Sequence, residues 1–238
     1  MRGRPEAKAQ LSITADFHVH TVHSPDSVIT FPLLVEACRR NGVDAVAVMD
    51  HDVIEGAFEF ESRSLEMKAA GEWAPRILVG EEVRTAQGEI CGLFLKEWVP
   101  NGLSAEETMT SIRSQGGLVY VPHPFDILKL KRLKARELVE LRDLIDIIEV
   151  FNGKPRYPRA NRLAARFVSR NPFPAAAGSD SHDPTRLGSV RVELEDFTGP
   201  RDLLDKLEDA RISGHLYSPF ASAFTRLRMR RHDQNILA

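Results

Sequence analysis

The sequence has little cysteine and no long apolar run. Only Cys38 and Cys91 occur among 238 residues, and neither lies in a CxxC pair. A disulfide framework or a cysteine-rich zinc site is therefore not expected. No stretch approaches the roughly 18 apolar residues that span a bilayer, and the N-terminal MRGRPEAKAQ lacks the apolar core of a signal peptide. We therefore expect a cytoplasmic protein with no membrane partner.

The chain also lacks an excess of charge of either sign, and it has few aromatic residues. There are 32 basic and 34 acidic residues, and aromatic residues make up 7%. The overall charge thus favours no nucleic-acid partner, and no alternation of basic and aromatic residues indicates a long single-strand binding surface. The absence of GxGxxG after the first apolar run and of GxSxG argues against a dinucleotide fold and a serine nucleophile.

Short apolar runs alternate with amphipathic stretches along the chain. Strands are predicted over residues 12–20, 44–49, 76–83, 89–95, 118–121, 144–150, 173–177 and 189–193, and helices over 31–40, 55–70, 104–115, 133–142, 158–169 and 200–212. Gln87-Gly88 predicts a hairpin between the third and fourth strands. The repeated strand–helix units indicate a parallel sheet covered by helices, and about seven of them favour a closed or nearly closed α/β barrel.

The barrel is expected to be a single domain at residues 11–217. Residues 1–10 are predicted to form a polar N-terminal tail. Residues 218–238, which contain RLRMRRH, are predicted to form a basic C-terminal segment. The sequence gives no indication of the oligomeric state.

Side chains that bind metals collect where the predicted strands end. They are His18, His20, Asp50, His51, Asp52, Glu82, His123, Asn152, Asp180 and His182. In a barrel of parallel strands all of these ends converge on one face. His18 and His20 are two residues apart, so on a strand they point to the same side. Histidines with carboxylates are typical ligands of zinc, manganese and iron, and this set is too large for one tetrahedral ion.

Each of these elements has an ordinary structural explanation when it is taken alone. An HxH pair is often on the surface, DHD can cap a helix, and GSDSH can be a polar loop. The ordinary explanations become poor together, because the elements recur at successive strand ends and use five of the eight histidines. The other three, His23, His215 and His232, are expected to be structural or solvent-facing.

At these residues the sequence resembles the PHP (polymerase and histidinol phosphatase) family of metal-dependent phosphoesterases. The motifs, in family order, are DFHVHTVHSPDS at 16–27, MDHD at 49–52, GEE at 80–82, VPHPFD at 121–126, EVFN at 149–152 and GSDSH at 178–182. The resemblance spans residues 13–185. It implies a distorted (β/α)7 TIM-like barrel with two or three divalent ions, of zinc, manganese or iron, at the carboxyl ends of the strands.

The resemblance also implies which residues hold each ion. It assigns the metal ligands as follows: His18, His20, Glu82 and Asp180 to one ion; Asp26, His51 and His182 to another; and Glu82 with His123 to a third position.

The chain departs from the family at Cys91, which stands where many members carry a further histidine. We interpret Cys91 as an apolar strand residue rather than a thiolate ligand. The third position is then short of ligands, and His123 could instead contact the phosphate.

The predicted reaction is hydrolysis of a phosphate ester by a metal-bridged hydroxide. His182 or His123 is the candidate for protonating the leaving group. Asn152, Arg156 and Arg159 are candidate substrate contacts, although a solvated helix start explains the two arginines equally well.

A small phosphomonoester is the favoured substrate, such as a nucleotide or a sugar or histidinol phosphate. The basic run KLKRLKAR at 129–136 could steer a nucleotide or an oligonucleotide end to the site, but a solvated helix face explains it better. The alternatives are a phosphodiesterase or exonuclease that acts on nucleic-acid ends, a non-catalytic regulatory domain stabilised by metal, and an amidohydrolase.

Overall fold

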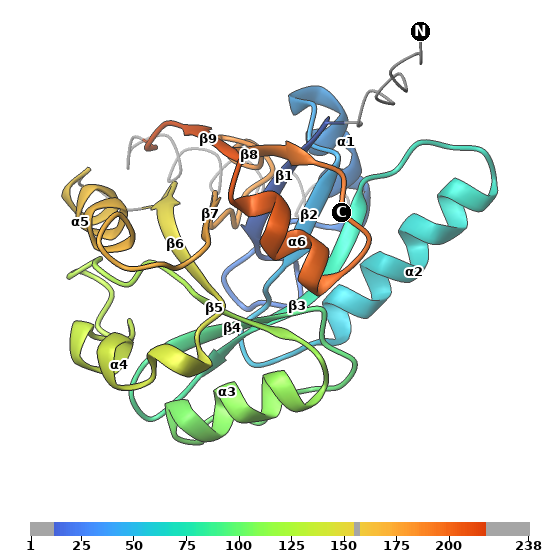
Figure 1. Ribbon diagram of the computed structural model, residues 1–238. Coiled ribbons are helices and arrows are strands. Elements are labelled where there is room, and N and C mark those ends of the chain that lie inside the picture. The colour runs from blue at the N-terminus through green and yellow to red at the C-terminus, as the bar shows by residue number, and fades with distance from the viewer. Residues whose placement is uncertain (1–11, 155–157, 218–238) are drawn as a thin grey trace, which may run out of the picture.

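The structure, a computed structural model, describes residues 12–154 and 158–217. Nine strands form one sheet in the order β7-β6-β5-β4-β3-β2-β1-β8-β9 (Figure 1). The strands are β1 (Ser12–Val19), β2 (Ala45–Val48), β3 (Arg76–Arg84), β4 (Glu89–Leu93), β5 (Leu118–Val121), β6 (Ile147–Asn152), β7 (Ala175–Gly178), β8 (Val190–Glu195) and β9 (Arg211–Gly214). The predicted tails at 1–10 and 218–238 lie outside the described residues.

Helices α1 to α5 lie around the outside of this sheet, and α6 lies across it (Figure 1). They are α1 (Phe31–Asn41), α2 (Glu55–Ala69), α3 (Ala105–Ser114), α4 (Ala135–Glu140), α5 (Arg159–Val168) and α6 (Pro200–Leu207), with a short 3-10 turn η1 (Arg142–Leu144). The capping box at Ser104 and Glu107 starts α3 as the sequence predicts. None of the helices in the described ranges is long and apolar enough to cross a membrane.

The sheet curls until β7 meets β1, which gives a nearly closed, TIM-like barrel. Val19 and Ser181 form a parallel bridge, and the backbone N–H of His20 donates to the carbonyl oxygen of Ser181 at 2.9 Å. Gly178 permits this approach, because a Cβ atom there would lie 2.2 Å from Cβ of His18. The barrel predicted from the alternating elements is confirmed.

Antiparallel strands interrupt the parallel order. β4 runs antiparallel to both β3 and β5, so the predicted hairpin is confirmed. β8 runs antiparallel to β1 and to β9. The predicted final helix over 200–212 is too long: α6 ends at Leu207, and Arg211–Gly214 becomes β9. The open edge of β8 offers these residues a ladder of backbone hydrogen bonds that a continued helix could not use.

Strand alternation separates an outer and an inner apolar cluster. In β2, Val46 and Val48 pack in the outer cluster with the buried face of α1, whereas Ala45 and Ala47 face the barrel interior. Leu203 and Leu207 of α6 belong to the inner cluster. This helix therefore covers an inner face of the sheet, and the barrel is filled with side chains rather than hollow.

Candidate metal centre

A β-bulge in β1 turns the first two histidines into the barrel. The register between β1 and β2 shifts between Asp16 and Val19, where β1 has one residue more than its partner. Phe17 packs in the inner cluster and Val19 in the outer one. His18 lies between them and also points inward. A regular strand would place Phe17 and His18 on opposite faces, so the bulge lets one strand fill the core and present a ligand.

Four groups of ligand-type side chains lie at the end of the barrel where the parallel strands finish. Within each group the donor atoms lie within 4.8 Å of one another. The groups are His18, His20 and Asp180; His20, His51 and His182; His51, Glu82 and Glu89; and His18, Glu82 and Cys91. Because the groups share members, they form one continuous cluster. Such a cluster fits several ions close together better than a single ion.

Hydrogen bonds orient the rings of His18 and His182 so that Nε2 faces the centre. Nδ1 of His18 lies 3.0 Å from Oε1 of Glu149, and Nδ1 of His182 lies 3.0 Å from the carbonyl oxygen of Asp180. Carboxylate and carbonyl oxygens only accept hydrogen bonds, so in each neutral ring Nδ1 carries the proton and donates it. Each Nε2 then keeps a free lone pair, which is the form that binds a metal.

The contact between His18 and His20 shows that these residues fit a cation. Oγ of Ser24 donates to Asp50 at 2.8 Å and therefore accepts from Nδ1 of His20, which lies 3.3 Å away. Nε2 of His20 is thus unprotonated, and it lies 3.1 Å from Nε2 of His18. Without a cation, a proton on Nε2 of His18 can bridge the two nitrogens; a divalent ion beside them would take its place and bind both lone pairs.

The carboxylates of the first predicted ligand set face the same two imidazole nitrogens. Oε2 of Glu82 lies 3.5 Å from Nε2 of His20 and 3.7 Å from Nε2 of His18. Oδ1 of Asp180 lies 3.4 Å and 4.0 Å from the same two atoms. The four residues that the resemblance assigns to one ion therefore lie together in the fold.

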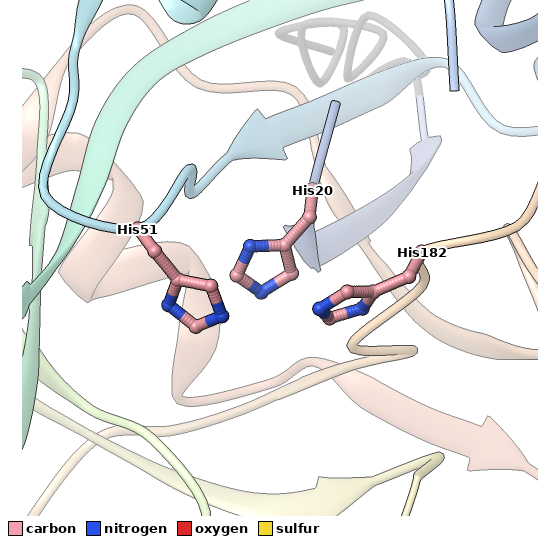
Figure 2. Close-up of side chains that lie close together, drawn as sticks. All are labelled: His20, His51 and His182. Atoms are coloured by element: carbon pink, nitrogen blue, oxygen red, sulfur yellow. The ribbon is translucent and has the colours of Figure 1, made fainter. Parts of the chain in front are cut away.

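The second predicted ligand set gathers around Asp26. Nε2 of His182 lies 3.1 Å from Oδ2 of Asp26, and Nε2 of His51 lies 4.0 Å from Oδ1. Figure 2 shows the rings of His20, His51 and His182 close together, although they come from the ends of β1, β2 and β7. The ring centroids of His20 and His182 are 4.1 Å apart.

The third predicted position gains a ligand-type residue that the sequence analysis missed. Nε2 of His123 lies 3.0 Å from Oε1 of Glu82 and 3.8 Å from Oε2 of Glu89. Because β4 is antiparallel, its first residue lies at the end of the barrel where β3 finishes, opposite Arg84. The predicted hairpin already implied that Glu89 lies at this end of the barrel.

Cys91 is fully buried in the inner apolar cluster, where burial raises the pKa of its thiol well above its usual value.

Two buried polar atoms near this position lack hydrogen-bond partners. Nδ1 of His51 and Oε2 of Glu82 lie 3.0 Å apart, yet neither makes a hydrogen bond within the described structure. Buried polar atoms are rarely left without a partner, and a metal ion is one partner that both a ring nitrogen and a carboxylate accept.

The electrostatics of the centre hold Asp180 and His20 in the protonation states that bind metals. Burial raises the pKa of Asp180, but the charges of Lys129 and Lys154 outweigh it and hold this pKa well below its usual value. Burial, reinforced by the charge of His182, lowers the pKa of His20 well below its usual value. At neutral pH the carboxylate is therefore ionised and the imidazole neutral, as metal ligation requires. Burial lowers the pKa of His18, but the charges of Asp180, Glu149 and Glu82 outweigh it and hold this pKa well above its usual value, so a cation would replace a proton there.

The predicted substrate contacts fall in different places. Asn152 is buried, and its Nδ2 donates to Glu149 at 2.9 Å and to Asp180 at 3.3 Å. Its amide therefore positions carboxylates of the metal centre rather than facing a substrate. Arg159 is exposed at the start of α5, where it lines a cavity with Phe125. Arg156 lies outside the described residues.

Comparison with known proteins agrees with this geometry. Residues 16–167 match the family model of the PHP domain, and residues 158–212 match the model described as PHP-associated. Two uncharacterized proteins of Methanocaldococcus jannaschii are similar: one is 37% identical over 65% of this chain and 90% of its own length, and the other is 29% identical over 81% and 78%.

A solved structure shares the fold. It is a two-domain protein of Bacteroides vulgatus that contains a predicted PHP-like metal-dependent phosphoesterase; the match covers 89% of this chain and 67% of that one, with a TM-score of 0.67 and 17% identity. At this identity the likeness concerns the fold alone. The family model, by contrast, covers more than half of the chain and includes five of the six motifs found in the sequence. The chain therefore belongs to the PHP domain family.

Proposed function

We propose that this protein hydrolyses a small phosphomonoester at the cluster of strand-end ligands. The observation that carries the proposal is the convergence of the Nε2 atoms of His18 and His20 with the carboxylates of Glu82 and Asp180. When bound there, divalent ions lower the pKa of a water molecule and neutralise charge on phosphoryl oxygens. This is the chemistry that hydrolysis of a phosphate ester needs, and it requires no covalent nucleophile from the chain.

The residues around the cluster have distinct parts in this proposal. Glu149 accepts hydrogen bonds from His18, from the hydroxyl of Tyr120 at 2.9 Å and from the backbone of His123 at 2.6 Å. It therefore fixes the orientation of one ligand and the position of another. Asn152 links this carboxylate to Asp180. Both are positioning residues.

Nε2 of both predicted proton donors, His182 and His123, faces the ligand cluster, and we therefore assign neither ring the protonation of the leaving group. Nε2 of His123 faces Oε1 of Glu82, and its ring is buried. Nε2 of His182 lies 3.2 Å from Nζ of Lys154, whose side chain is partly exposed.

The test is phosphate release from a panel of nucleotides, sugar phosphates and histidinol phosphate. Protein stripped with a chelator is assayed before and after addition of Mn²⁺ or Zn²⁺, with His20→Ala as the inactive variant and His215→Ala, at an exposed position, as its matched control. We expect release that depends on metal and is lost only in His20→Ala. If diesters are cleaved and no monoester is, the substrate assignment is wrong; if a metal-loaded protein cleaves neither, the hydrolase assignment is wrong.

A further inference from the structure

Two lysines that no part of the proposed chemistry uses reach into the metal centre. Lys129 lies in the loop after β5, and its Nζ is 2.6 Å from Oδ2 of Asp180. Lys154 follows β6, and its Nζ is 3.2 Å from Oδ1 of the same carboxylate. Their side chains are 18% and 30% exposed, so both amines are partly shielded from solvent beside Asp180.

The backbone around each lysine is held in place. The N–H of Lys154 donates to Oδ1 of Asn152 at 2.9 Å. The N–H of Lys129 donates to the carbonyl oxygen of Asp126 at 3.0 Å, and its own carbonyl oxygen accepts from the guanidinium of Arg132 at 3.1 Å. Backbone hydrogen bonds therefore hold the main chain from which each lysine side chain extends.

These amines cannot serve as metal ligands. A lysine ammonium has three donors and no lone pair. Nζ of Lys154 also lies 3.2 Å from Nε2 of His182, a nitrogen that would face a cation. Once Asp180 and His182 bind divalent ions, two ammonium groups beside them would be repelled unless an anion lies between. A phosphoryl group meets this requirement, because it offers several non-bridging oxygens to the ions and the amines together.

We propose that Lys129 and Lys154 clamp the non-bridging oxygens of the phosphoryl group and select a monoester dianion over a diester monoanion. The Coulomb attraction of two fixed positive charges grows in proportion to the charge of the bound group, so the dianion gains about twice as much from them. This inference rests on the proposed function, since it names the substrate class of the same site.

The experiment compares two esters with one leaving group. Metal-loaded full-length protein is assayed with p-nitrophenyl phosphate and with bis(p-nitrophenyl) phosphate, as wild type and as Lys129→Met and Lys154→Met. We expect each substitution to lower kcat/KM for the monoester roughly 10- to 100-fold, the range of a charge-assisted hydrogen bond, and for the diester only a few-fold. Lys131→Met, in the same loop with an exposed side chain, should leave both values unchanged.

Two further measurements separate the clamp from other roles. Bound metal per chain should be the same in all four proteins; loss of metal from either clamp variant would show that the lysine supports Asp180 rather than substrate, and would overturn the proposal. Inorganic phosphate should bind the Mn²⁺-loaded wild type and Lys131→Met with equal affinity, and both clamp variants at least tenfold more weakly by calorimetry.

The outcomes distinguish this proposal from the one on which it rests. If the wild type cleaves monoesters but the clamp variants lose activity toward both esters equally, or lose none, the selection by Lys129 and Lys154 is refuted and the hydrolase stands. If the wild type cleaves neither ester, the proposed function fails, and the phosphate titration still decides the clamp: unchanged affinity in both variants refutes it.

Discussion

Glu81 and Glu82 are neighbours in the sequence with opposite surroundings. Alternation along β3 places Glu82 among the histidines of the barrel mouth and Glu81 on the outer side, where Oε2 accepts from the N–H of Val99 at 3.0 Å. Burial, with smaller contributions from the charges of Asp52 and Glu55, raises the pKa of Glu81 to about 8. One acid of the GEE motif thus faces the histidines of the centre, and the other lies away from them and accepts a hydrogen bond from the backbone of Val99.

This difference predicts the effect of Glu81→Gln on stability. The usual pKa of 4.5 rises to about 8 on folding, so the folded chain holds this proton more tightly than the unfolded chain. The contribution of Glu81 to stability therefore falls as pH rises from about 4.5 to about 8. Glu81→Gln keeps the acceptor and removes the titration, so its melting temperature minus that of the wild type should increase across this window.

The measurement is thermal unfolding at pH 5 and pH 9 on chelator-treated protein. Glu106→Gln, an exposed acid on α3, serves as the control and should show a difference that does not change with pH. A constant difference for Glu81→Gln as well would contradict the raised pKa.

His20 occupies two of the ligand groups, so its removal should affect more than one ion. Nε2 of His20 lies within reach of His18 and Asp180 on one side and of His51 and His182 on the other. We expect His20→Ala to lose at least about one equivalent of bound Zn²⁺ or Mn²⁺ per chain, because each site would keep too few ligands. Elemental analysis after dialysis measures this, and full retention of metal would place the ions elsewhere.

At the scale of elements, the bounds of the strands were easier to predict than which of their side chains face the barrel interior. The periodicity of the sequence located most strands within a few residues, because apolar runs and glycine stops are local signals. The bulge in β1 and a second register shift between Glu149 and Phe151 in β6 left no such signal. Each adds one residue and so changes which side chains face inward, a result that depends on the neighbouring strand.

Gly178 tests the closure of the barrel between β7 and β1. A Cβ atom at this position would lie 2.6 Å from the backbone nitrogen of His18. Gly178→Ala should therefore destabilise the fold by about 3 kcal/mol or more and weaken metal binding, because the strand that carries His18 must move. Gly199→Ala is the matched control, since nothing lies within 4 Å of an added Cβ there and its backbone is extended.

Denaturant unfolding with metal analysis gives both quantities. A Gly178→Ala protein as stable as Gly199→Ala, with metal retained, would show that the two strands do not approach as closely as this barrel requires.

At the scale of the whole molecule, the centre ties distant parts of the chain to one another. The ligand groups join side chains from the ends of β1, β2, β3 and β7 with two from β4, Glu89 and Cys91. Without cations, the carboxylates among them repel each other in a buried place. Metal that binds only the folded chain should therefore contribute to its stability.

Removal of metal should lower the melting temperature of the protein. An ion present at 100 times its dissociation constant stabilises by about 2.7 kcal/mol, which for a domain of this size corresponds to roughly 5–10 °C. Scanning calorimetry of stripped protein with and without added Mn²⁺ or Zn²⁺ measures the shift. His20→Ala should respond less than the wild type; an equal response would mean that the stabilising ion binds outside this centre.

The sequence by itself determined the family, the barrel and the identity of most ligand-type residues. These depend on local signals: apolar periodicity, turn residues, and motifs such as HxH and GSDSH that follow successive strands. Parallel strands carry their ends to one face whatever their exact order, so convergence of His18, Asp180 and the others followed from the pattern alone.

Only the tertiary structure decided which atoms meet. It brought Glu89 to the third position through the direction of β4, and Lys129 and Lys154 to Asp180 through loops whose path no local pattern specifies. It also set the two register shifts that aim His18 and Asn152 inward. These features depend on contacts between segments far apart in the chain, and the sequence of any one segment does not contain them.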